Sequence, residues 1–297
     1  MFPKNSDQIT RNYMDSLLIE TRYIDSVLPD SHLSLWGHTF DTPITTAALS
    51  HLNGTAPDGM KIYAEGAVQA GALHFVGMGP EEELRAILST GAKTVKIVKP
   101  MADQDAILRE LKMAEEAGCV AVGMDIDHSF SSNGTYDNIF GIAMKSQSYE
   151  DLDRYINSVS IPFVIKGVLS PVDAVKCRRL GAAGIVVSHH HGMVDYAIPP
   201  LMALPEIRKV SGEMAVFVDC GFSSGMDVYK ALALGATAVS VGRHLMPLLK
   251  DGAEAVSDRI KEMDAELRGV MARTGIKDLA SMDPTVIHPT WPGSTVL

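Results

Sequence analysis

Three consecutive histidines, His189, His190 and His191, follow a short apolar run at residues 184–188. Imidazole gains or loses a proton near neutral pH, so a histidine at the end of a buried strand can act as a general acid or base. Such a run could also bind a metal ion, but neighbouring side chains on an extended chain point to opposite sides and cannot all converge on one ion. We therefore expect no metal site, one histidine in acid–base chemistry and the other two in local packing.

Two later apolar runs end in residues that could bind a phosphate group. The first ends in Asp219, Cys220 and Gly221, and the second ends in Gly242 and Arg243. Glycines let backbone N–H groups approach an anion, and an arginine guanidinium can bind the anion through two parallel hydrogen bonds. A glycine after a strand is often only a turn, but the two sets together favour a ligand that carries a phosphate.

A repeated unit of helix, glycine and β-branched run positions these residues. It occurs at residues 91–98, 118–126, 181–189 and 235–242. Glycine just after a helix can adopt the left-handed conformation that ends it, and a fully apolar run suits a parallel strand covered on both faces. The repeat predicts alternating strands and helices.

The alternation extends over the whole chain and predicts a (β/α)₈ TIM barrel, an α/β fold. The eight expected strands are residues 43–49, 72–77, 94–98, 120–126, 162–168, 184–188, 215–219 and 238–241. The expected helices include residues 81–89, 103–117, 171–180 and 225–234. The candidate phosphate residues then lie after strands seven and eight, where such barrels commonly bind phosphate.

The remaining segments predict a single domain over residues 1–297, because no linker divides the chain. Residues 5–42 precede the first strand and predict an amino-terminal helical cap, and residues 253–273 predict a long closing helix. Residues 128–147, rich in Ser, Asn and Gly, follow the fourth strand. In a barrel this segment lies on the active-site face, so we expect either a substrate lid or a solvent-exposed loop.

Composition narrows the class of partner. The net charge of −10 argues against a nucleic-acid partner, which normally meets a basic surface, and favours a small molecule. The three cysteines show no CxxC spacing, and the chain has neither a signal-like start nor an apolar run long enough to span a membrane. We expect a cytoplasmic protein without a membrane partner.

Two longer runs resemble the carboxyl-terminal half of a known enzyme family. They read FVIKGVLSPVDAVKCRRLGAAGIVVSHHHGMVDYAIPPLMALPEI and VFVDCGFSSGMDVYKALALGATAVSVGR, and the run PITTAALSHLNGTAPDG after strand one matches more loosely. They resemble the FMN-dependent 2-hydroxy acid oxidases and dehydrogenases, the family of glycolate oxidase and lactate oxidase. The resemblance implies an FMN-dependent oxidoreductase that acts on a small molecule and assembles as a homo-oligomer, commonly a tetramer.

The resemblance also implies roles for single residues. His190 matches the family's catalytic base, although His191 could face the site instead, and Lys166 would stabilise negative charge on the reduced flavin. Asp195 would orient the His190 imidazole, or would only form a turn. Residues expected to contact FMN are Ala47, Ala48, Lys96, Lys166, Ser188, Asp219, Gly221, Gly242 and Arg243.

The chain departs from the family pattern mainly where the substrate binds. Met193 stands where the family has the arginine that binds the substrate carboxylate, and a thioether cannot replace that arginine. His128, His191 and Met193 are the expected substrate contacts. Without the arginine, the substrate is either neutral or an anion that meets Lys96, Lys99 or His128. Other departures from the pattern are Lys96 for Gln, Val98 for Tyr, Gly123 for Thr, and Ser223 and Ser224 for two basic residues.

Four functions remain open at this stage, because a fold and its cofactor do not fix a reaction. The first is an FMN oxidoreductase with His190 as the proton-transfer group. The others are an FMN-dependent isomerase or reductase on the same barrel, a non-catalytic flavin-binding or phosphosugar-binding protein, and a flavin-free phosphosugar barrel.

Overall fold

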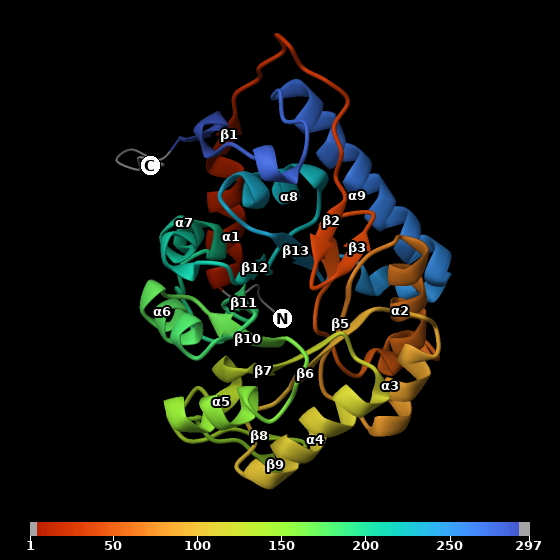
Figure 1. The fold of residues 1–297 in the computed structure, drawn as a ribbon, viewed down its shortest axis with the longest axis vertical. Coiled ribbons are helices and arrows are strands. Elements are labelled where there is room, and N and C mark those ends of the chain that lie inside the picture. The colour runs from red at the N-terminus through yellow and green to blue at the C-terminus, as the bar shows by residue number, and fades with distance from the viewer. Residues whose placement is uncertain (1–4, 291–297) are drawn as a thin grey trace.

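Eight parallel strands form the centre of the computed structural model, which describes residues 5–290 (Figure 1). The strands follow the order β4-β13-β12-β11-β10-β7-β6-β5. Their bounds are β4 Ile44–Thr46, β5 His74–Val76, β6 Thr94–Val98, β7 Ala121–Asp125, β10 Phe163–Val168, β11 Gly184–Val187, β12 Ala215–Val218 and β13 Ala238–Val241. The Thr46 amide donates to the Leu73 carbonyl, and Leu49 bridges Val76, so β4 and β5 also lie side by side. The predicted (β/α)₈ barrel is confirmed.

Helices surround this barrel (Figure 1). Their bounds are α1 Asn5–Ser16, α2 Gly59–Gln69, α3 Glu81–Leu88, α4 Gln104–Ala117, α5 Tyr149–Ile156, α6 Pro171–Arg179, α7 Pro200–Ser211, α8 Gly225–Ala233 and α9 Ala253–Arg273. Short 3₁₀ helices are η1 Leu52–Gly54, η2 Ile126–Ser129, η3 Met246–Asp251, η4 Leu279–Ser281 and η5 Pro284–Val286. The closing helix α9 has the predicted bounds and packs on α2 and α8.

Local residues explain how several helices begin and end. The Ser170 side chain accepts a hydrogen bond from the Asp173 amide at the start of α6, with Pro171 at the first helical position. Pro80 precedes the acidic first turn of α3. Gly118 ends α4 with φ of 97°, a conformation that side chains other than glycine rarely adopt.

Side chains alternate between the barrel interior and the helices. Val95 and Ile97 of β6 pack in the interior with Val164 and Phe217 from other strands. The residues between them on each strand pack against the surrounding helices, as Ile165 of β10 does. Because this alternation has a period of two, a shift of one residue moves a side chain to the opposite face of the strand.

The prediction of a helical cap over residues 5–42 is wrong beyond residue 16. Helix α1 is followed by β1 Leu17–Ile19, which pairs with β14 Ile287–Pro289, and then by a hairpin of β2 Leu33–Leu35 and β3 His38–Phe40. Leu33 and Phe40 are buried with the interior side chains of the barrel. The physical reason is that the amino end of the barrel needs an apolar cover, which the alternating side chains of a hairpin supply.

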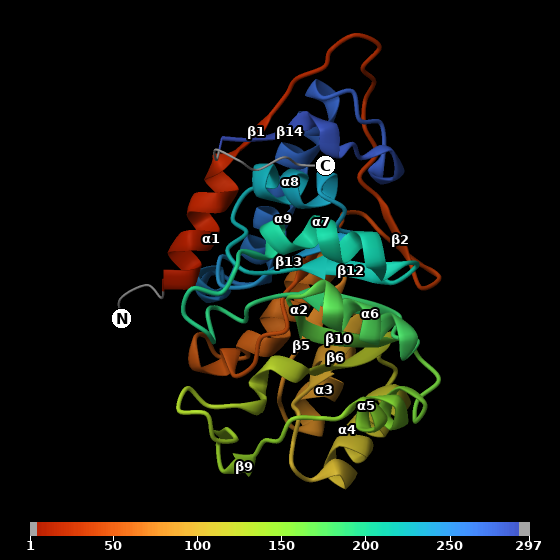
Figure 2. The same ribbon diagram turned by 90° about the vertical axis from the view of Figure 1, so that its left-hand side faces the viewer.

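The segment after β7 is partly ordered by a small hairpin of β8 Asn138–Ile139 and β9 Ile142–Ala143. Phe130 and Tyr136 stack beside it with ring centroids 5.3 Å apart, and exposed Phe140 meets His51 edge to face at 4.8 Å. Figure 2 shows this segment and α1 on the same side of the barrel. A lid over the carboxyl ends of the strands remains our proposal for it.

Within residues 5–290, no helix combines the length and the apolar character needed to cross a bilayer.

Tyr63 of α2 joins two strand ends at the closing edge of the barrel. Its buried hydroxyl donates to the Val241 carbonyl at 2.8 Å and accepts from the Ala47 amide at 3.1 Å. We expect Tyr63→Phe to lower the free energy of unfolding by about 1–3 kcal/mol, because it removes a buried hydrogen-bond partner. Urea denaturation measures this, with Tyr149→Phe at the half-exposed start of α5 as the matched control. Equal stability of the two variants would contradict the prediction.

Candidate active site

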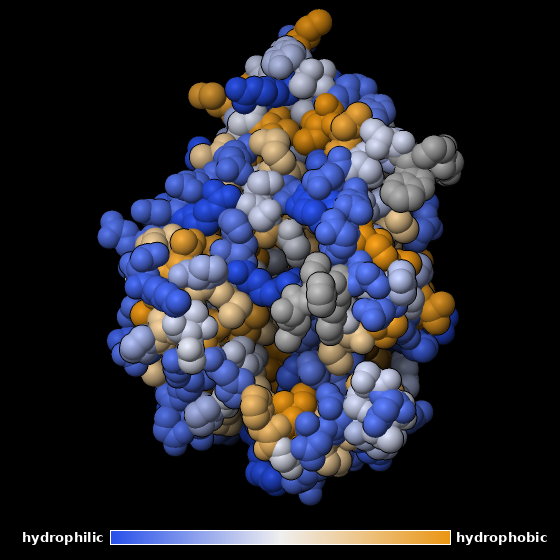
Figure 3. Space-filling model, turned by 180° about the vertical axis from the view of Figure 1, so that it is seen from behind, coloured by the Kyte–Doolittle hydropathy of each residue, from blue (hydrophilic) through white to orange (hydrophobic). Residues whose placement is uncertain are grey.

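A cavity of about 660 Å³ opens at the carboxyl ends of the strands. Residues in or just after β4, β10, β11, β12 and β13 contribute to it, together with one residue of α1. It is lined by Asp7, Ala47, Ala48, Leu49, Lys166, His190, His191, Asp219, Cys220, Gly221, Phe222, Ser223, Ser240, Gly242, Arg243, His244 and Met246. Figure 3 views the side of the molecule on which α1 lies and shows a mostly hydrophilic surface, with hydrophobic side chains near the top, at both sides and in the lower part.

Two other cavities have similar volumes but different surroundings. One of about 820 Å³ lies at the amino end of the barrel beside Leu33 and Thr237, and one of about 680 Å³ lies beside Met226 and Val270. Barrel enzymes carry their chemistry at the carboxyl ends of the strands. The cavity that contains Lys166 and His190 is therefore the candidate active site.

A buried carboxylate joins the ends of three neighbouring strands. Asp125 at the end of β7 accepts from the Lys166 ammonium of β10 at 2.9 Å and from the Lys99 ammonium, just after β6, at 2.5 Å. Burial would raise the pKa of Asp125, but the charges of Lys166, His190 and Lys99 hold it well below its usual value. Burial would lower the pKa of Lys166, but Asp125, Asp127 and Asp219 raise it. Lys166 therefore stays charged.

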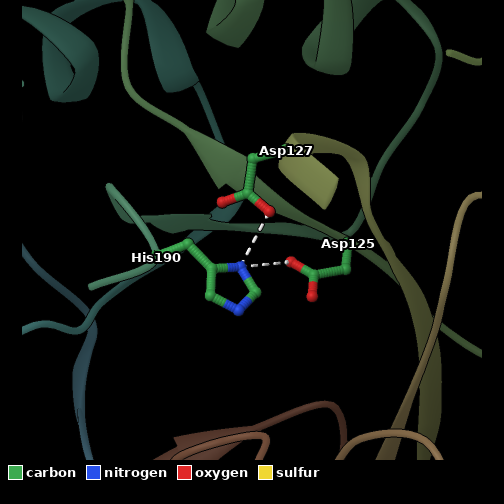
Figure 4. A group of neighbouring side chains, drawn as sticks. All are labelled: Asp125, Asp127 and His190. Atoms are coloured by element: carbon green, nitrogen blue, oxygen red, sulfur yellow. Dashed lines mark hydrogen bonds and ion pairs between the residues drawn. The ribbon is translucent and has the colours of Figure 1, made fainter. Parts of the chain in front are cut away.

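The His190 ring lies beside Asp125 and Asp127, and its Nδ1 atom points toward both carboxylates (Figure 4). Nδ1 is 2.8 Å from Asp127 Oδ1, 3.1 Å from Lys166 Nζ and 3.3 Å from Asp125 Oδ1. Burial would lower the pKa of His190, but Asp125 and the hydrogen bonds to both carboxylates raise it to about 9. A proton on Nδ1 leaves Nε2 as the ring atom that can exchange a proton with a ligand.

The three side chains in Figure 4 also have the composition of a metal site, since their ligand atoms lie within 4.8 Å of one another. The Lys166 ammonium, however, is within hydrogen-bonding distance of both Asp125 Oδ1 and His190 Nδ1. A metal ion bound to these atoms would meet that positive charge at short range. The contacts describe an ion-pair network in which Lys166 is the cation.

His128 packs edge to face on His190, with ring centroids 4.4 Å apart. Burial, Lys99 and His190 together lower the pKa of His128 to about 4. The ring is therefore neutral near pH 7 and presents a polar surface beside His190.

The other two histidines of the run have separate partners. His189 is buried, with Nε2 2.8 Å from Thr10 Oγ1 of α1 and Nδ1 accepting from the Gly192 amide. His191 Nδ1 lies 2.5 Å from a carboxylate oxygen of Asp7, also on α1, and its Nε2 accepts from Arg243 at 3.1 Å. Only His190 contacts the Lys166 network, so the geometry favours it among the three.

Arg243 supplies a second positive charge to the cavity lining. Neighbouring Gly242 leaves room for close backbone packing, because a Cβ there would lie 2.9 Å from the Cβ of Ala47. The Arg243 guanidinium already contacts Asp7, at 3.3 and 3.4 Å. The cavity lining thus contains Lys166 and Arg243, and Arg243 is paired with a carboxylate from α1.

Comparison with known proteins identifies the family. The family model for FMN-dependent dehydrogenases matches residues 4–148 and 131–289. The chain belongs to this family. Glycolate oxidase 3 of Arabidopsis thaliana is 28% identical over 326 residues, which cover 96% of this chain and 88% of the relative. An L-lactate oxidase of Roseobacter sp. (strain GAI101) is 39% identical over 150 residues, which cover 50% of this chain and 40% of the relative.

Solved structures agree with this assignment. A mandelate oxidase with (S)-2-phenylpropionate has a TM-score of 0.86 and 26% identity, covering 96% of this chain and 89% of that one. A mandelate oxidase variant with a C4a-OH-FMN adduct has a TM-score of 0.85 and 26% identity. The match covers 94% of this chain and 90% of that one. This member of the FMN-dependent dehydrogenase family is therefore an FMN-dependent oxidoreductase that resembles the 2-hydroxy acid oxidases.

The cavity of this family member suits FMN. Its volume lies within the roughly 300–1,000 Å³ of small-molecule and cofactor sites. Arg243 could bind a phosphate, and the Lys166 ammonium could face the flavin ring and stabilise negative charge there. Most residues predicted to contact FMN do line the cavity: Ala47, Ala48, Lys166, Asp219, Gly221, Gly242 and Arg243.

The sequence predicts that Lys96 contacts FMN, but its side chain points away from the cavity. It lies between interior residues Val95 and Ile97, so it points toward the helices, and its Nζ donates to the Gly77 carbonyl at 2.5 Å. Burial lowers the pKa of Lys96, and Glu110 of α4 is the main opposing charge. Lys99, two residues beyond Ile97, is the lysine of this segment that contacts Asp125.

Asp195, Ser188 and Met193 do not make the contacts predicted for them. Asp195 was expected to contact His190, Ser188 to contact FMN and Met193 to contact the substrate. Asp195 is exposed, and within residues 5–290 its side chain makes no hydrogen bond or ion pair. The carboxylates on His190 come from β7 and η2 instead. Ser188 lies beneath the cavity, where its Oγ accepts from the His190 amide at 3.0 Å. Met193 is absent from the cavity lining among these residues.

Three acidic residues of this site escaped the sequence analysis. Asp125 ends an apolar strand just as Lys166 does, so the same reasoning could have found it. Asp127 follows two residues later in η2, beyond the end of the strand, so the strand pattern gave no signal for it. Asp7 gave no local signal, because only the fold brings α1 to Arg243.

The contact between Asp7 and Arg243 is expected to weaken the binding of FMN. A phosphate on Arg243 would be repelled by the Asp7 carboxylate, so Asp7→Asn should bind FMN a few-fold more tightly, the size expected for a half-exposed ion pair. Quenching of FMN fluorescence by the apoprotein measures the Kd. Asp15→Asn, the same charge change farther along α1, should bind FMN as the unmodified protein does. Weaker FMN binding by Asp7→Asn would show that Asp7 supports the phosphate site instead.

Proposed function

We propose that this protein oxidises a small 2-hydroxy acid, with His190 accepting the proton of the substrate hydroxyl. The observation that carries the proposal is the His190 imidazole, held at Nδ1 by carboxylates beside Lys166 and, within residues 5–290, without a hydrogen-bond partner at Nε2. Bound FMN supplies a ring that accepts a hydride equivalent from the substrate carbon. We further propose that residues 1–297 form a single FMN-binding domain.

Each group in the site has a separate task in this proposal. Nε2 of His190 takes the hydroxyl proton, and the carboxylates on the other side of the ring stabilise the imidazolium that results. The Lys166 ammonium stabilises negative charge on the flavin, and Arg243 binds the cofactor phosphate. Family members include an enzyme named 4-hydroxymandelate oxidase, from Amycolatopsis orientalis, which is 27% identical over 84% of this chain.

Lys99 is our candidate for the group that binds the substrate carboxylate. Met193 provides no charge, and Lys96 faces the helices. Lys99 remains 13% exposed beside Asp125, and one ion pair leaves an ammonium with two further donors. The Lys99 and Lys166 ammonium groups both lie against Asp125, so a carboxylate bound here would meet positive charge at short range.

A second candidate is the reverse reaction, reduction of a 2-oxo acid. The raised pKa of His190, about 9, favours it, because the imidazolium present near pH 7 would donate a proton to the carbonyl oxygen. The two directions differ in whether a 2-hydroxy acid reduces the bound flavin or a 2-oxo acid reoxidises it.

The test is anaerobic mixing of the FMN-loaded protein with a panel of 2-hydroxy acids and neutral alcohols. Bleaching of the flavin absorption by 2-hydroxy acids alone supports the proposal, and reoxidation of the reduced protein by 2-oxo acids supports the reverse reaction. If neither happens and the protein interconverts isomers without net redox change, the isomerase alternative replaces both. Reduction by neutral alcohols alone would exclude a carboxylate site.

We propose a cytoplasmic location and a homo-oligomeric state as well. Cys119, Cys177 and Cys220 are free thiols, which suits a reducing compartment. The oligomer rests on the resemblance found in the sequence, and light scattering after size-exclusion chromatography measures it.

Replacement of His190 tests its role in proton transfer. We expect His190→Asn to slow anaerobic flavin reduction by about 10²–10⁴-fold, because the proton acceptor is lost. The Kd for FMN should change by no more than about twofold. His288→Asn, on an exposed ring paired with Glu20, is the control and should react normally. Flavin reduction at the normal rate in His190→Asn would contradict the assignment.

Replacement of Lys99 tests carboxylate binding. Lys99→Met should raise KM about tenfold or more with little change in FMN affinity, since a charged hydrogen bond to the substrate is lost. Lys99→Arg should recover most of the affinity, and Lys93→Met, at the exposed turn before β6, should leave KM unchanged. An unchanged KM in a Lys99→Met protein of normal melting temperature would assign the carboxylate to another group.

A further inference from the structure

The part of the cavity near Arg243 has little positive charge to offer a phosphate. Arg243 is itself paired with Asp7, at 3.3 and 3.4 Å. Ser223 and Ser224 stand where the family pattern has two basic residues. A phosphate monoester carries a charge of about −1.5 to −2 near pH 7, so its binding calls for donors beyond Arg243.

The two serines do not replace the missing cations, because they stabilise the start of α8. The Ser223 amide donates to Asp227 Oδ2 at 3.1 Å, and the Ser223 hydroxyl lies 3.4 Å from the same oxygen. The Ser224 hydroxyl accepts from the Asp227 amide as the helix cap. Arg11 of α1 binds the Asp227 carboxylate through both terminal nitrogens, at 2.8 and 3.0 Å. A further phosphate donor must therefore come from another segment.

His244, which follows Arg243 in the cavity lining, has a suitable hydrogen. Its Nε2 lies 2.9 Å from Nε of Arg259 on α9. A guanidinium donates and never accepts, so His244 Nε2 is the acceptor and the hydrogen of the neutral ring lies on Nδ1. Burial and the Arg259 charge lower the pKa of His244, which keeps the ring neutral near pH 7. Among residues 5–290, Nδ1 has no hydrogen-bond partner, so it can donate to a ligand.

The Arg259 guanidinium is fixed by several contacts at once. It donates from Nη2 to the Ser223 carbonyl at 2.7 Å and from Nη1 to Glu262 at 2.9 Å, and Glu266 lies 3.6 Å away. Its side chain is only 22% exposed. Through His244 and Ser223, this one side chain joins the loops after β13 and β12, the two strand ends at which barrels commonly bind phosphate.

We propose that His244 donates its Nδ1 hydrogen to the phosphate of FMN, and that Arg259 is the positioning residue that fixes this tautomer. The arginine charge next to Nε2 also polarises the ring and strengthens Nδ1 as a donor. A helix outside the cavity thus supplies what the loop after β12 lacks. The inference concerns the cofactor and holds whatever the substrate is, so it goes beyond the oxidation proposed above.

The experiment compares FMN with riboflavin, which lacks only the phosphate, as ligands of the full-length apoprotein. Quenching of flavin fluorescence measures both Kd values. His244→Ala should bind FMN about five- to tenfold more weakly, because a hydrogen bond to a charged group is lost from a partly exposed ring. Its Kd for riboflavin should stay within about twofold, which also shows that the variant is folded. His288→Ala, on an exposed ring of β14, is the control and should bind both flavins normally.

A second pair of variants tests the positioning role of Arg259. Arg259→Gln should weaken FMN binding a few-fold and leave riboflavin binding unchanged, whereas Arg109→Gln on exposed α4 should affect neither. A double variant with His244→Ala should bind FMN no more weakly than His244→Ala alone, because the arginine acts through the histidine. In ¹⁵N-histidine-labelled protein, the His244 ring should carry its hydrogen on Nδ1, and Arg259→Gln should populate both tautomers.

The opposite results would overturn the proposal. These are unchanged FMN binding by His244→Ala, or an equal loss of affinity for FMN and riboflavin, which would indicate a structural effect. Additive losses in the double variant, or a hydrogen on Nε2 of His244, would remove the positioning role of Arg259. All of these measurements follow binding or ring nitrogens, so they stand even if no 2-hydroxy acid reduces the flavin.

Discussion

The arrangement of the site depends on one buried carboxylate. Moving Asp125 out of water costs several kcal/mol unless its charge is paired and its oxygens are hydrogen-bonded. Lys99 and Lys166 satisfy both oxygens, and each comes from a strand next to β7. A parallel barrel makes this possible, because it brings the carboxyl ends of neighbouring strands to the same edge.

Three residues near the same edge have a strained backbone. His190 and His191 adopt φ of 47° and 57°, and Cys220 adopts 76°, values that residues with a side chain rarely take. Helix α1 fixes these loops from outside, through Thr10 on His189 and Asp7 on His191. The amino-terminal helix is thus part of the site, and its acidic side chain acts on the end of the cavity that holds Arg243.

The sequence predicts the barrel well because its strands are buried on both faces and its helices end at glycine. Lys166 and Arg243 could be found because each is a single charge at the end of an apolar run. Lys96 was misjudged because its register, which decides between the interior and the helices, depends on neighbouring strands. Asp127 and Asp195 could not be separated from sequence, since the partner of His190 comes from a segment 63 residues away in the chain.

The most direct test of the account is a crystal structure of the protein with FMN bound. The account predicts the phosphate on Arg243, the flavin ring next to Lys166, and His190 with Nδ1 on Asp127 and Nε2 toward the ring. FMN bound in another cavity, or His190 turned away with Nδ1 free of both carboxylates, would contradict it.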